Sequence, residues 1–195
     1  MEVTREEHLP VPSDEELVVA TLAGEEVAFA ELVRRYKRTV ARIAGRFFPR
    51  QEEIEEMIQA TFCRAYRAMP QFRGSRQQSF PAWLSSITAN ACLDELRRGQ
   101  RKQERLFSAL SEAETSRLRQ ATSVASSEQQ LISRDLAHYL LAHLAPEDRM
   151  TLTLLYEEEW SMAEIANLLG WSVAKVKGRA YQARQTLQRV MEQMQ

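Results

Sequence analysis

The residues best suited to recognising a ligand are cationic and polar side chains near the C-terminus. They share an arc opposite an apolar stripe of Val173, Val176, Ala180, Ala183, Leu187 and Val190. Lysine and arginine bind phosphate, and lysine, arginine and glutamine also bind base edges in the major groove. We therefore expect a DNA-binding helix, although an ordinary helical hairpin with a solvated basic face is the alternative. The candidate residues are Ser172, Lys175, Lys177, Gly178, Arg179, Tyr181, Gln182 and Arg184.

The signals around this helix predict a short partner helix and a sharp turn. Ser161 and Glu164 have the spacing of a capping box, and Gly170 suits the left-handed residue that ends a helix. Ser172 is then placed to cap the second helix. A short capped helix, a glycine turn and a cationic second helix predict a helix-turn-helix.

A second candidate surface is an acidic cluster in residues 52–56, where four of five residues are glutamate. One or two acids at a helix N-terminus complement the helix dipole. Four acids exceed that need, so we expect a docking face for a basic partner. The candidate docking residues are Glu53, Glu56 and Gln59.

A third group combines aromatic rings with cations, as proteins that bind single-stranded nucleic acid do. A polar loop over residues 70–78 contains Phe72 and Arg73. The helix expected after it, residues 79–98, carries Trp83 and Asn90 and ends in Arg97 and Arg98. In the alternative reading Trp83 belongs to the core, Phe72 packs under the loop and Asn90 caps a backbone group.

Composition restricts the class of protein. The net charge of -1 is an average over an acidic N-terminal part and basic segments further along the chain. Cys63 and Cys92 lack metal-ligand spacing, so we expect half-buried or buried thiols, no metal and no cofactor. The sequence has no membrane-spanning run and no signal peptide, which predicts a soluble cytoplasmic protein with no membrane insertion.

The apolar periodicity predicts an all-α fold of two small helical domains joined by a flexible linker. Residues 1–12 read as a disordered leader, 13–99 as the first domain, 100–127 as the linker and 128–195 as the domain with the helix-turn-helix. In the first domain we expect a short helix closed by Gly24, a long helix stopped by Pro49, and a helix over 51–69. In the second, Ile132, Leu136, Leu140 and Leu144 share a face, and Pro146 opens a helix through Glu158.

Three segments in this order resemble the extracytoplasmic-function (ECF) sigma factors, over roughly residues 14–190. The first is EEIEEMIQATFCRAY, which resembles the acidic helix that these factors press against RNA polymerase. The second is FRG followed by FPAWLSSITANACLDELRR, similar to the segment that opens and reads the minus-ten element. The third runs from LAPEDR to VKGRAYQAR and is similar to the domain that binds the minus-thirty-five element.

The resemblance implies a function for each candidate surface. Glu53, Glu56 and Gln59 would bind core RNA polymerase. Minus-ten DNA would be bound as a melted strand by Phe72, Arg73, Trp83, Asn90, Arg97 and Arg98, and minus-thirty-five duplex by the helix-turn-helix residues. The chain would not be an enzyme, would be nucleoid-associated when bound to polymerase, and would be open to an anti-sigma partner.

Two departures from the family pattern affect the minus-ten and minus-thirty-five residues. The loop between Gly74 and Phe80 is about two residues longer than usual, and Gly178 stands where the family often has serine. Other readings are a helix-turn-helix regulator that cannot replace a sigma factor, and a helical adaptor that binds only protein.

Overall fold

The computed structural model describes residues 11–74, 79–109, 140–141, 143–156 and 159–193, with the side chains of 106–109 left out. Every regular element in those residues is helical, which confirms the all-α class, and none of the described helices is both long and apolar enough to span a membrane. The chain divides into two compact units, 1–88 and 89–195. The expected leader up to residue 10, and the linker from residue 110 on, lie outside the described residues.

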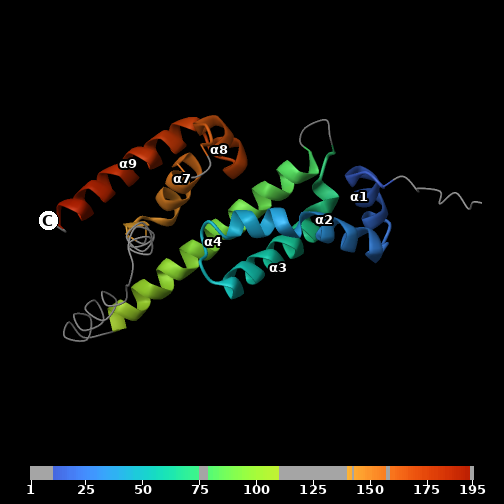
Figure 1. Ribbon diagram of the computed structural model, residues 1–195, viewed down its shortest axis with the longest axis horizontal. Coiled ribbons are helices and arrows are strands. Elements are labelled where there is room, and N and C mark those ends of the chain that lie inside the picture. Colours follow the sequence, from blue (N-terminus) through green and yellow to red (C-terminus); the bar gives the residue numbers. More distant parts are fainter. Residues whose placement is uncertain (1–10, 75–78, 110–139, 142, 157–158, 194–195) are drawn as a thin grey trace, which may run out of the picture. The chain divides into compact units, whose positions relative to one another are not determined.

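The first unit begins with two helices joined by a glycine turn (Figure 1). Helix α1 spans Asp14–Leu22 and α2 spans Glu26–Ala44. Ser13 and Glu16 form both bonds of the expected capping box, and Gly24 has a φ of 96° after the helix end. An ionic link joins the helices, because Arg35 Nη1 lies 3.2 Å from Asp14 Oδ1 and the Tyr36 hydroxyl donates to the same carboxylate.

Helix α2 ends earlier than the sequence indicates. We expected it to continue to Pro49, but it stops at Ala44, and a tight turn follows in which the amides of Phe47 and Phe48 bond to the Ala44 carbonyl. Gly45 is the C-cap, a position that its low helix propensity favours. Phe47 is still buried, but from the turn rather than from a helical stripe.

Helix α3 spans Gln51–Ala68, and a single 3-10 turn, Met69–Gln71, follows it. Its inner face packs into one core with α1, α2 and the start of α4. Ile58, Phe62, Ala65 and Met69 are buried as the stripe predicted, and Met57 is buried beside them. Cys63 is exposed, so the expectation of a shielded thiol is wrong for this cysteine and right for Cys92.

Helix α4 spans Phe80–Ala109 and is much longer than expected. Residues 100–109, which the sequence places in the linker, continue the helix as regular turns. The sequence there lacks an apolar stripe but is rich in Gln, Arg, Lys and Glu, which have high helix propensity. Gln100 also donates to Glu104 at 3.0 Å, an i,i+4 contact along the helix surface.

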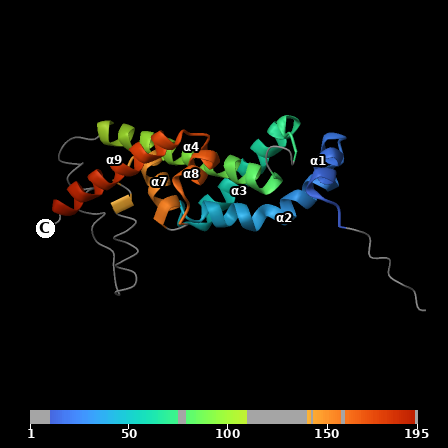
Figure 2. The ribbon, with the colours of Figure 1, turned by 90° about the horizontal axis from the view of Figure 1, so that it is seen from above.

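The second unit contains α7, Pro146–Tyr156, then α8, Met162–Leu169, and α9, Val173–Glu192 (Figure 2). α7 packs against both α8 and α9, and Met150, Ile165 and Val176 are fully buried. Of the stripe predicted before Pro146, Leu140 lies in a helix and Leu144 is buried, whereas Ile132 and Leu136 lie outside the described residues. Val173 is 41% exposed, so its place on the buried stripe is wrong. It begins the helix, where no preceding turn covers it.

Candidate nucleic-acid interface

The turn between α8 and α9 is built as the sequence predicts. Ser161 accepts from the Glu164 amide at 3.2 Å, and the Glu164 carboxylate accepts from the Ser161 amide at 2.8 Å. Gly170 closes α8 with a φ of 66°, in the left-handed region that suits glycine. The Ser172 hydroxyl accepts from the Lys175 amide at 3.2 Å, so it caps α9. These bonds fix the angle at which α9 presents its outer face.

The outer face of α9 has a neutral centre between two cationic edges. With 100° between successive residues, Gly178, Tyr181 and Gln182 lie opposite the buried Val176, Ala180 and Ala183. Lys177 and Arg184 fall along one edge, and Lys175 and Arg179 along the other. Tyr181 is 64% exposed, and the Gln182 side chain is also exposed. This pattern suits a helix between two phosphate backbones, with its centre towards the base edges.

Three of the four edge cations are held by a neighbouring side chain. Lys175 Nζ lies 4.1 Å from the centre of the Trp171 ring, a cation–π contact. Arg184 Nε donates to the Tyr156 hydroxyl at 3.0 Å. Arg179 Nη1 lies 3.5 Å from Asp148 Oδ1 and 3.4 Å from Gln182 Oε1. Sequence reasoning missed the supports from Tyr156 and Asp148, because both residues belong to α7, far away in the chain.

Asp148 is the least exposed acid on this surface, with 6% of its surface accessible. Burial raises its pKa, while the charge and hydrogen bond of Arg179 oppose that shift. The pKa of the neighbouring Glu147 shifts in the opposite direction. Although burial raises that pKa, the hydrogen bonds from Arg97 hold it below its usual value.

The candidate minus-ten residues are spread along the Phe72 turn and α4. Phe72 is half-buried, with its ring centre 5.7 Å from that of Phe80 and 5.0 Å from that of Trp83. Phe72 and Trp83 therefore pack against the first unit's core, and each also keeps an exposed part. Arg73 is exposed, and residues 75–78, the longer loop, lie outside the described residues.

Further along α4, Asn90 is half-exposed, and both arginines have acidic partners. Arg97 donates to Glu147 Oε1 from Nε at 2.9 Å and from Nη2 at 2.6 Å, and Arg98 Nη1 lies 2.7 Å from Glu95. For Arg97 to bind a phosphate, it must exchange one anionic partner for another.

The polar side chains of α3 form two groups, those that make contacts within the fold and those that are exposed. Glu53 caps the helix, accepting from the Arg50 side chain at 2.8 Å, and Glu55 lies 3.3 Å from Lys37 Nζ. Glu52, Glu56 and Gln59 are exposed on one face. Glu56 and Gln59 are thus the candidate docking residues least involved in the fold.

No group of three or more His, Cys, Asp or Glu side chains in the described part of the chain is placed to hold a metal ion.

Comparison with known proteins decides the family. Residues 32–102 match the model of sigma-70 region 2, and residues 134–187 match that of sigma-70 region 4. The ECF RNA polymerase sigma factor SigM of Mycobacterium tuberculosis is 30% identical over 92% of this chain and 85% of its own length. The ECF RNA polymerase sigma-E factor of Escherichia coli K12 is 31% identical over 90% of this chain and 92% of its own length.

The chain belongs to the ECF sigma factors. Among solved structures, the ECF chain resembles CnrH in complex with the cytosolic domain of CnrY, with a TM-score of 0.51 and 25% identity over 92% of this chain and 97% of that one. The sigma factor RpoE of Bartonella quintana, solved with the anti-sigma factor NepR, shares the fold at a TM-score of 0.51 and 21% identity, over 84% of this chain and 96% of that one. As a member of this family, the chain directs promoter-specific transcription initiation with RNA polymerase.

Proposed function

We propose that this ECF sigma factor uses α9 to bind the minus-thirty-five element, α4 with the Phe72 turn to bind the melted minus-ten element, and α3 to bind core polymerase. The observation that carries the proposal is the α9 face, where cationic edges flank a neutral, exposed centre over a buried stripe. A helix docked in the major groove has phosphate backbones on both sides and base edges beneath it. The edges supply affinity, and the centre together with Lys177 supplies sequence preference.

The minus-ten proposal rests on residues that follow one another along the chain. Phe72 and Trp83 offer partly exposed rings for stacking, and Asn90 carries both a donor and an acceptor for a base edge. Arg73, Arg97 and Arg98 would contact phosphates of the same strand. Holding an unstacked base offsets part of the few kcal/mol that its removal from the duplex costs.

The docking proposal for α3 rests on charge and exposure. Glu56 and Gln59 are exposed on the face opposite the buried Ile58 and Phe62, so a partner can bind them without disturbing the core. Glu53 takes part in docking as well as in capping. The remaining part of the proposal is that the polymerase supplies all catalysis, that the sigma factor is nucleoid-associated in the bound state, and that an anti-sigma protein controls it.

Run-off transcription with purified core polymerase and this protein alone tests the proposed function. The templates are duplex fragments selected from a random library by the reconstituted holoenzyme. Defined transcripts that require the added protein support the proposal. A helix-turn-helix regulator would bind duplex DNA but yield no transcript with core alone, and a protein-only adaptor would select no DNA.

A further inference from the structure

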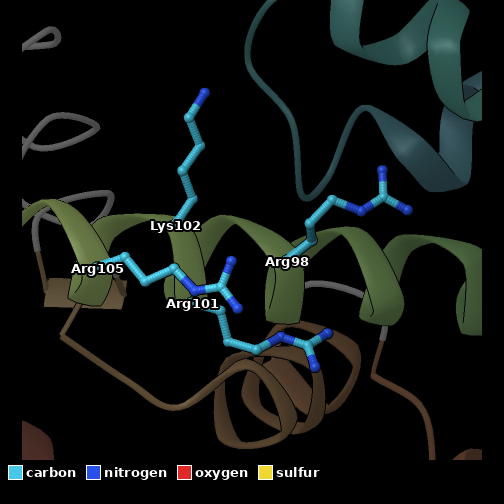
Figure 3. A pocket seen from close by; sticks show the side chains of 4 residues that line it. All are labelled: Arg98, Arg101, Lys102 and Arg105. Carbon is cyan, nitrogen blue, oxygen red and sulfur yellow. The ribbon is translucent and has the colours of Figure 1, made fainter.

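The C-terminal part of α4 carries a cationic face, and Arg98 is its only member with a function proposed above. Arg98, Arg101, Lys102 and Arg105 occupy positions i, i+3, i+4 and i+7, which share one side of a helix. They line an open pocket of about 460 Å³, and Figure 3 shows their side chains projecting from successive turns. We call these four residues the α4 basic stripe. It extends about 10 Å along the helix at 1.5 Å per residue.

Acidic side chains lie at the start of the stripe and beside it. Arg98 pairs there with Glu95, and Asp94 lies within 3.5 Å of Arg97 one turn earlier. Glu104 lies three residues after Arg101, beside the stripe, and Gln100 donates to it at 3.0 Å. All four side chains of the stripe are exposed. Residues 97–105 contain five cations and one acid, Glu104, so this segment is positive in a protein whose net charge is -1.

We propose that the α4 basic stripe binds the phosphate backbone of the duplex between the minus-ten and minus-thirty-five elements. This rests on the proposed function of α4 and α9. The proposed minus-ten residues on α4 end at Arg98, and the stripe continues the same helix beyond them, in the chain direction that leads to α9. That duplex carries about one charge per 1.7 Å, a density that matches four cations on a short helical face.

The contact is independent of sequence, because side chains that bind phosphate read no base edge. The match to sigma-70 region 2 ends at residue 102, so Arg105 lies beyond the matched segment. The stripe exists only because residues 100–109 are helical. In an irregular linker the same cations would have no common face.

The test measures binding of holoenzyme, formed from core polymerase and the full chain, to promoters selected by the wild-type holoenzyme. The variant Arg101→Gln/Lys102→Gln/Arg105→Gln removes three charges and leaves Arg98 in place. On full duplex promoters the slope of log affinity against log salt should decrease by about two to three units, at about 0.9 per phosphate contact. The affinity deficit of the variant should then shrink by about 40-fold between 50 and 200 mM salt.

Three comparisons make the outcome specific. On a fork template with no duplex upstream of the minus-ten element, the variant and wild type should bind with equal slopes. The matched variant Arg101→Lys/Arg105→Lys keeps the charge and should keep the wild-type slope, and all proteins should have the same helical circular dichroism. Replacing the spacer sequence should leave the difference between variant and wild type unchanged.

Each result that contradicts the proposal has a different interpretation. An unchanged slope on the full duplex overturns the proposal, and an equal loss on the fork template assigns the stripe to the minus-ten element instead. Weaker binding of the variant to core polymerase would assign the stripe to an acidic protein surface. If the wild-type holoenzyme selects no promoter, the proposed function itself is wrong.

Discussion

The guanidinium of Arg179, on one edge of α9, lies 3.5 Å from the buried carboxylate of Asp148 at the start of α7. This pair links the proposed minus-thirty-five helix to the element that supports it. Arg179 compensates a buried charge, and we propose that it also binds a phosphate. The two members of the pair are expected to respond differently to substitution.

Asp148→Asn should strengthen DNA binding without weakening the fold at neutral pH. It removes a negative charge beside α9 and releases Arg179 for phosphate. Since the pKa of Asp148 is raised in the folded state, the neutral side chain is the better-tolerated form. The neutral Asp148 carboxyl contributes fully to stability at a pH below its pKa in the unfolded chain. This contribution is lost as the pH rises through its pKa in the folded protein. Urea unfolding at pH 4 and pH 7 should show Asp148→Asn at least as stable as wild type at pH 7, with a smaller difference at pH 4.

Arg179→Ala should instead reduce both stability and DNA affinity. It leaves the Asp148 carboxylate without its cationic partner, which costs about 1–3 kcal/mol of unfolding free energy. The double variant Asp148→Asn/Arg179→Ala should recover most of that stability and none of the affinity. If the single Arg179 variant unfolds at the wild-type urea concentration, the pair has no structural role.

Lys177→Ala and Lys175→Ala form a matched test of base reading against phosphate binding. Both lysines are exposed and lie two residues apart, on opposite edges of α9. Lys177 should read a base, so its loss should change the preferred minus-thirty-five sequence at a cost of about 1–3 kcal/mol for the preferred site. Lys175 is held over Trp171, and its replacement should weaken DNA binding equally on all sequences. The salt slope of this variant should be smaller by about one unit. Selection from a random duplex library distinguishes them, and identical preferences for both variants would contradict the assignment of Lys177.

Glu56→Lys should weaken binding to core polymerase by about tenfold or more, which is about 1.4 kcal/mol. Glu56 is exposed and has no role in the α3 cap, so the fold should be preserved by circular dichroism. The control is Glu15→Lys, an equal change of charge at an exposed position of α1. Glu53→Lys is a less clean test, because it also breaks the contact with Arg50. Equal competition for core by the Glu56 variant and wild type would reject the docking face.

Phe72→Ala and Asn90→Ala should both slow opening of duplex promoters, measured by permanganate reactivity of exposed thymines. A lost stacking contact costs about 1–3 kcal/mol per base. A promoter with mismatches across the minus-ten element should recover part of the loss, since its unstacking cost is already met. Phe72 also packs on Phe80 and Trp83, so Phe72→Ala should lower the free energy of unfolding. The loss should be smaller than that for a fully buried phenylalanine, which is about 3–5 kcal/mol.

Asn90→Ala provides the more direct test of the two, because Asn90 is half-exposed and outside the aromatic cluster. Thermal unfolding measured in parallel separates a folding defect of the Phe72 variant from a binding defect. Normal opening by both variants would place the minus-ten pocket elsewhere.

The sequence by itself determined the local features. Capping boxes at Ser13 and Ser161, the glycine that ends α8 and the buried stripe of α9 follow from short-range rules, because each involves residues within one or two turns. The order of the acidic, aromatic and cationic segments was sufficient to indicate the ECF family. The exposed face of α3 was also predictable, since its apolar positions repeat at helical spacing.

The structure alone decided what depends on residues far apart in the chain, or on helix formation without an apolar stripe. The support of Arg179 by Asp148 and of Arg184 by Tyr156 requires α7 to pack on α9, which no local pattern encodes. The end of α2 at Ala44 depends on burial of Phe47 from a turn. The basic stripe appeared only when residues 100–109 proved helical. High helix propensity without amphipathic periodicity resembles a linker in the sequence, and only a regular backbone brings Arg98, Arg101, Lys102 and Arg105 onto one face.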